Sequence, residues 1–129
     1  MARSGKVKAE FFAWADRLLN VEVPKGTVAF HFNLYEGIDS VHVQLAGTES
    51  FSTVPEYWPG GETFSSGDDV FHVPFEVAGT NWQEWLEALR RLASSYIATG
   101  KNSGVLRSSQ GVGIGFVDGD MYVLWQPAV

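Results

Sequence analysis

Alternation of apolar and polar residues predicts two strands in the first half of the chain. Residues 27–35 and 40–46 each place apolar side chains on one face and polar side chains on the other. A pattern of this kind is typical of a sheet with one face on the core and one face in water. The short loop at residues 36–39 predicts that the two strands form an antiparallel hairpin.

The polar face of this hairpin forms a ladder of possible ligand-binding side chains. We expect Tyr35 to pair with Ser40. The ladder, which we expect to be exposed to solvent, then consists of His31, Asn33, His42 and Gln44.

Apolar positions with a helical period predict two helices. The first covers residues 6–20, with Ser4 as its N-cap. The second covers residues 81–98, where Thr80 and Gln83 are spaced as a capping box. The apolar stripe of this second helix comprises Trp82, Trp85, Leu86, Leu89, Leu92, Ala93 and Tyr96.

The segment between the first hairpin and the second helix is irregular in sequence. Residues 47–69 mix prolines, glycines, acids and aromatics, which predicts a long surface excursion with a short strand near Thr63 and Phe64. Residues 70–75 read as a further strand, and Pro74 favours an edge position for it. Residues 101–110 read as a polar linker.

The last segment, residues 111–125, reads GVGIGFVDGDMYVLW. Asp118-Gly119 between two β-favouring runs predicts a hairpin with a type I′ turn, with Gly113 opposite Leu124. The glycines resemble a dinucleotide-binding loop, but a strand-turn-strand pattern follows them and no helix N-terminus is available for a pyrophosphate. We therefore interpret them as packing residues, and the acids beside Gly119 as turn residues, not metal ligands.

Together these elements predict a single α+β domain over residues 1–129. The expected order is α-β-β-β-α-β-β, with an antiparallel sheet of about five strands and two helices packed on one face.

Composition and charge narrow the function. The net charge of −6 argues against binding to nucleic acid or to an anionic membrane, and it suits a basic protein partner. The absence of cysteine excludes disulfides and thiolate-bound metals. No apolar run approaches the ~20 residues that a membrane span needs, and no signal peptide is visible, so we expect a cytoplasmic protein.

The sequence offers no complete catalytic set. Its three histidines lack a cysteine or a serine in a nucleophile elbow, and no third metal ligand is spaced to join His31 and His42. We therefore expect no enzymatic activity, no cofactor and no metal site.

Several stretches resemble a family of small bacterial proteins. These stretches are FNLYEG, VQLAGT, ETFSSGDDVFHVP, a W-x-x-W-x-x-x-L helix and GVGIGFVDGDMYVL, which together span residues 32–124. They are similar to immunity proteins encoded beside polymorphic or contact-dependent toxins. The resemblance implies a cytoplasmic binder that neutralises a cognate toxin and has no enzymatic activity. It implies no particular site residues.

From the acidic and aromatic side chains we expect two partner-binding patches. The first comprises Glu56, Tyr57, Trp58, Glu62, Asp68 and Asp69, and the second comprises Glu36 and Asp39. The expected partner is a basic toxin, and the protein itself is expected to be a monomer or a weak homodimer. Two alternatives remain open: a small-molecule-binding or enzymatic domain that uses the polar ladder, and an accessory subunit that pairs through residues 70–75.

Overall fold

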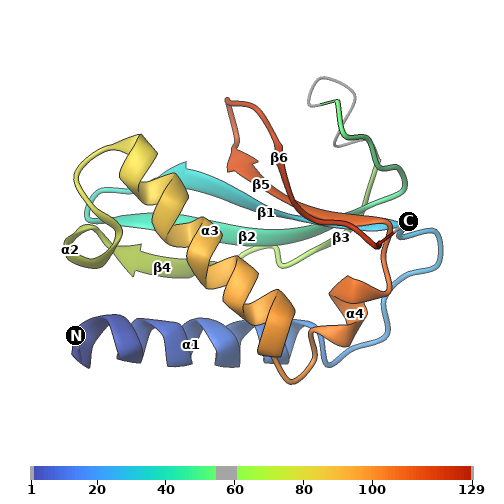
Figure 1. Ribbon diagram of the computed structural model, residues 1–129, viewed down its shortest axis with the longest axis horizontal. Helices are drawn as coiled ribbons and strands as arrows, with labels where there is room; N and C mark the ends of the chain where they lie inside the picture. The colour runs from blue at the N-terminus through green and yellow to red at the C-terminus, as the bar shows by residue number, and fades with distance from the viewer. Residues whose placement is uncertain (1, 55–60, 129) are drawn as a thin grey trace.

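The computed structural model describes residues 2–54 and 61–128 and shows a mixed fold with one open six-stranded sheet in that part of the chain (Figure 1). The helices are α1 (Ala2–Leu18), α2 (Phe75–Ala78), α3 (Trp82–Thr99) and α4 (Gly104–Arg107). The strands are β1 (Ala29–Glu36), β2 (Ser40–Thr48), β3 (Glu62–Ser65), β4 (Phe71–Pro74), β5 (Gly111–Phe116) and β6 (Tyr122–Trp125).

Strand β1 lies inside the sheet, between β2 and β5. It pairs antiparallel with β2, as expected, but parallel with β5, so the prediction of a wholly antiparallel sheet is wrong. The reason lies in the connection: α3 and α4 return the chain to the end of the sheet where β1 begins. Such a long crossover is what a parallel pair requires.

The register of the first hairpin differs from the prediction by two residues. Tyr35 pairs with His42, and Asn33 pairs with Gln44. The turn is tighter than expected, because the Gly37 N–H donates to the Ser40 carbonyl at 2.8 Å. Gly37 is needed here, since a Cβ at this position would lie 2.3 Å from the His42 ring.

The edge of the sheet beside β2 is one interrupted strand. Both β3 and β4 pair antiparallel with β2, which confirms the short strand near Thr63 and the edge position of Pro74. Between them, Ser66 bridges the gap: its N–H donates to the Leu45 carbonyl, and its hydroxyl accepts from the Leu45 N–H. The interruption lets the 66–70 loop turn towards α1.

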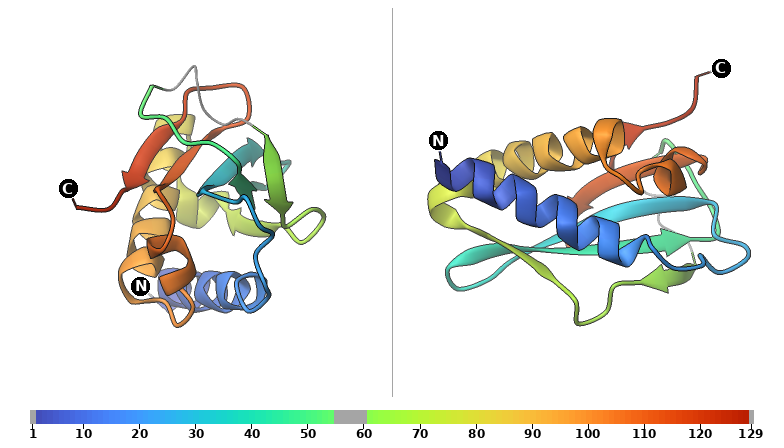
Figure 2. Two further views of the ribbon diagram at one scale, coloured as in Figure 1. Left: turned by 90° about the vertical axis from the view of Figure 1, so that its right-hand side faces the viewer. Right: turned by 90° about the horizontal axis from the view of Figure 1, so that it is seen from below.

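The main core lies between the sheet and the helices, which cover one face (Figures 1 and 2). Helix α1 buries Phe11, whose ring contacts Trp14, Phe32 and Phe71. Truncating a buried phenylalanine of this kind costs about 3–5 kcal/mol. Helix α1 begins at Ala2, four residues before the predicted start, so Ser4 lies inside the helix and does not cap it.

A buried polar tie joins α1 to the end of α3. The fully buried Tyr96 donates its hydroxyl to the Asp16 carboxylate at 2.6 Å, and Asn102 donates its backbone N–H to the same oxygen. Burial, with Asp16 next in effect, raises the pKa of Tyr96 above its ordinary value. The predicted polar linker is therefore structured, and it contains α4 with the buried Leu106.

The closing hairpin forms, but its turn and register differ from the prediction. The Gly119 N–H donates to the Phe116 carbonyl, so the turn centres on Val117-Asp118, and neither Asp118 nor Gly119 has a positive φ. A type I′ turn is therefore absent. The Val117 N–H donates to the Leu34 carbonyl, which keeps Val117 in the ladder with β1.

Strand β6 keeps the predicted register where Val112 pairs with Trp125, but the register shifts by one residue between Val112 and Gly113, so that Gly113 lies opposite Val123 in place of Leu124. The packing interpretation of Gly115 agrees with the structure, because a Cβ there would lie 2.4 Å from the Asp120 carbonyl oxygen.

We predict that Gly115→Ala destabilises the protein by about 1–3 kcal/mol, because backbone must move to admit the methyl group. Urea unfolding followed by tryptophan fluorescence measures this. Gly5→Ala is the matched control, since a Cβ at Gly5 meets nothing within 4 Å. Equal midpoints for the two variants would contradict the close approach at Gly115.

Candidate functional site

The predicted acidic patches are only partly brought together. Glu56, Tyr57 and Trp58 lie outside the described residues. Glu62 is exposed at the start of β3, beside Thr48 of β2, and Thr48 pairs with Ala29 at the start of β1. Glu36 lies at the other end of β1. Seven residues of strand separate it from Ala29, which is about 23 Å.

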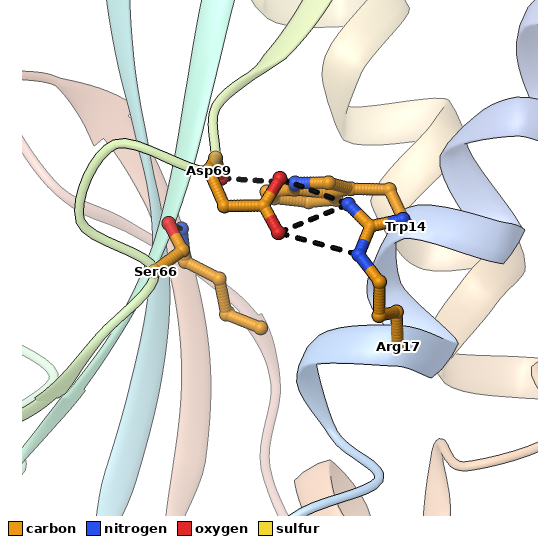
Figure 3. Close-up of polar contacts among 5 residues, drawn as sticks. Trp14, Arg17, Ser66 and Asp69 are labelled. Carbon is orange, nitrogen blue, oxygen red and sulfur yellow. Dashed lines mark hydrogen bonds and ion pairs between the residues drawn. The ribbon is translucent and has the colours of Figure 1, made fainter.

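Asp69, predicted for partner binding, makes contacts within the protein (Figure 3). Its carboxylate accepts three hydrogen bonds from the Arg17 guanidinium, the shortest at 2.8 Å, and its carbonyl accepts from the Trp14 indole at 3.0 Å. These contacts fix the 66–70 loop on α1. The neighbouring Asp68 is exposed on the same loop.

The side chains of the polar ladder contact one another and neighbouring residues of the protein. The Asn33 amide donates to Gln44 at 3.5 Å, and Gln44 donates to the Gly67 carbonyl at 3.2 Å. The His42 ring contacts the Tyr35 ring edge-on and the His72 ring in a tilted arrangement, with a centroid distance of 4.1 Å to His72. Burial and the neighbouring His72 lower the pKa of His42, although Asp39 acts in the opposite direction.

His31, expected on an exposed ladder, is buried, with 6% of its surface accessible. It lies within the interior strand β1, and Gly113 of β5 is its neighbour in register. The same face carries a second apolar cluster, formed by Ala29 and Met121 with Val28 and Phe51 packed against it. Burial lowers the pKa of His31 from its ordinary 6.5 to about 4, so its imidazole is neutral at pH 7.

A hollow lies where β1, the β5–β6 turn and the start of α3 meet. Its volume is about 510 Å³. We call it the aromatic cavity because five aromatic residues line it: Tyr35, Trp82, Trp85, Phe116 and Tyr122. Three acidic residues also line it: Glu36, Asp118 and Asp120.

The start of α3 positions the two tryptophans of this cavity. Gly79 has φ +120, which turns the chain into the helix, and Asn81 caps it by accepting from the Glu84 N–H at 3.0 Å. Glu84 in turn accepts from the Thr80 N–H at 2.8 Å. The capping arrangement thus lies one residue after the predicted Thr80–Gln83 box. Asn81 takes the cap because its extended backbone aims its side chain at the first turn.

Trp85 forms a fixed wall of the aromatic cavity. Its indole N–H donates to the Gly79 carbonyl at 2.8 Å, and its ring stacks on Phe75 with centroids 5.0 Å apart. Trp82, which the apolar stripe predicted to be in the core, is instead 52% exposed. One turn of helix therefore presents one anchored indole and one accessible indole to the same cavity.

Glu36, which the sequence analysis predicted for partner binding, lines this cavity, but the sequence did not predict the cavity itself. From the sequence, Trp82 belongs to the apolar stripe of a helix and Tyr122 to a strand, while Asp118 and Asp120 are predicted to be turn residues. The one signal in the sequence was weak: Trp82 is the first residue of its helix, where a side chain can lie outside the core. Only the parallel pairing of β1 with β5 places these residues around one hollow.

Other classes of site find little support within the described residues. No group of three or more His, Asp or Glu side chains is placed to hold a metal ion there, and no helix in that part is long and apolar enough to cross a membrane. Comparisons with protein-family models, with curated proteins and with solved structures gave no match.

We predict that His31 makes the free energy of unfolding fall as the pH is lowered. Between pH 6.5 and 4 the unfolded chain binds a proton at this imidazole and the folded chain does not, so stability is lost as the pH falls through this window. At pH 4.5 the loss is about 2–3 kcal/mol relative to pH 7.5.

Urea unfolding of wild type and His31→Gln at the two pH values measures this loss. The variant should lose less stability than wild type on acidification, while the control His42→Gln should keep most of the wild-type loss. The same loss in wild type and His31→Gln would contradict the assignment.

Proposed function

We propose that this protein is a non-enzymatic, immunity-type inhibitor that binds and neutralises a basic toxin. The observation that carries the proposal is the aromatic cavity, where exposed aromatic side chains and carboxylates occupy one concave surface. Aromatic anchors within a charged rim are the composition of protein-binding surfaces. The resemblance to immunity proteins and the net charge of −6 support the same reading.

The proposed interface combines the aromatic cavity with the β1–β2 turn. Glu36 borders the cavity, and Asp39 lies three residues further along the turn, next to the fully exposed Ile38. Glu36 of the second predicted patch thus shares the cavity with Asp118 and Asp120. The first patch, represented among described residues by Glu62 and Asp68, is a separate acidic region.

The arrangement of the polar residues favours binding over catalysis. The Ser40 hydroxyl lies 3.5 Å from Nδ1 of His72, the histidine whose ring contacts His42, and Ser40 is 4% exposed. A hydroxyl so buried and so weakly bonded is not placed to attack a substrate.

Co-expression with the product of the neighbouring gene tests the proposal directly. We expect the neighbour to be basic and toxic alone, the toxicity to be suppressed by this protein, and the two to co-purify. A harmless neighbour, or a toxic neighbour that neither binds nor is suppressed, would contradict an immunity function.

We predict that the double variant Glu36→Lys/Asp118→Lys slows association with the basic partner by at least about tenfold at low salt and changes dissociation less, because long-range attraction acts on encounter. Stopped-flow fluorescence at several salt concentrations measures both rates. Glu10→Lys/Glu22→Lys, in and just after α1, is the control with the same change in charge. Equal association rates for the two double variants would place the interface elsewhere.

A further inference from the structure

We propose that the aromatic cavity is a receptor for a single arginine side chain presented by the protein partner. This inference rests on the proposed function, since it names the chemical group by which the partner is held. It is carried by the size of the cavity, by the exposure of its aromatic residues and by the charges around it.

The cavity has one anchored wall and an accessible rim. Trp85, 9% exposed, is held by its indole hydrogen bond and by the Phe75 ring, so it offers a surface that needs no ordering on binding. Trp82 and Tyr122 are 52% and 47% exposed, and they line the same hollow. Exposure of two large aromatic rings beside a concave surface is typical of a binding site.

The charges at the rim are of one sign. Glu36, Asp118 and Asp120 contribute carboxylates, and none of the lining residues in the described ranges is basic. Arg90 of α3 lines the adjoining groove. Its guanidinium forms an ion pair with Glu87 at 2.7 Å. The positive end of the α3 dipole is offset by Glu84 in the first turn. The cavity therefore favours a cation.

A guanidinium group fits both parts of this site. Its planar face stacks on indole and phenol rings, while its N–H groups reach carboxylates in pairs. An ammonium group has no plane to stack, and a neutral donor forms weaker hydrogen bonds with the carboxylates because it carries no charge. The volume of about 510 Å³ lies in the range of ligand pockets and admits an arginine side chain with its flanking backbone.

Titration of the ¹⁵N-labelled full chain tests this without the toxin. The probe is N-acetyl-arginine-methylamide, and the matched control is the citrulline analogue, which has nearly the same shape and no charge. We expect saturable shifts of the Trp82 indole and of the Asp118–Asp120 amides with the arginine probe, and binding at least about tenfold weaker with citrulline and weaker with the lysine analogue.

Two variants locate the binding. Glu36→Gln/Asp118→Asn/Asp120→Asn removes the rim charges, and Trp82→Ala removes an exposed ring. Each variant should bind the arginine probe about tenfold more weakly than wild type does. Glu10→Gln/Glu22→Gln/Glu49→Gln, which removes three exposed charges away from the cavity, should leave its affinity unchanged.

The outcomes separate this inference from the proposed function. Arginine binding without any co-purifying basic partner would keep the cavity assignment and overturn the immunity function. A toxin that binds wild type and the cavity variants equally would keep the immunity function and overturn the arginine receptor. The arginine receptor would also be overturned if the arginine probe showed no saturable binding, or if the arginine and citrulline probes bound equally.

Discussion

The parallel pairing of β1 with β5 is the constraint on which the rest of the structure depends. It requires a crossover, which α3 and α4 supply, and it places the carboxyl ends of both strands at the same end of the sheet. Ligands of open sheets commonly bind outside the carboxyl ends of parallel strands. Here the aromatic cavity lies at that end, bordered by Glu36 after β1 and by the β5–β6 turn.

The polar contacts of the helix layer keep that crossover in position. Asp16 joins Tyr96 and Asn102 where α3 ends, and the Asp69 contacts join α1 to the edge loop. The partly buried hydrogen bonds to the Asp16 carboxylate contribute more than the half-exposed Arg17–Asp69 pair, because water screens the latter more strongly. Helix α3 is thus held at its last residues, and the rings at its first turn lie against β5 and β6.

Local patterns predicted much of the fold. Alternation located β1 and β2, helical periodicity located most of α1 and α3, and Pro74 indicated an edge strand. The errors arose where a neighbour distant in sequence decides. His31 is polar and alternates as an exposed residue would, yet β5 and the second apolar cluster bury it. The turn of the last hairpin shifted because Val117 bonds to Leu34 of β1.

The sequence by itself determined most of the longer helices and strands, the acidic charge and the absence of thiol chemistry, because these depend on local residue order and composition. Tertiary structure alone decided the direction of β5, the burial of His31 and the grouping of Glu36 with Trp82 and Tyr122. The physical reason is that a pairing between strands separated by some 80 residues is chosen by the packing of the helices between them, and no local pattern encodes that choice.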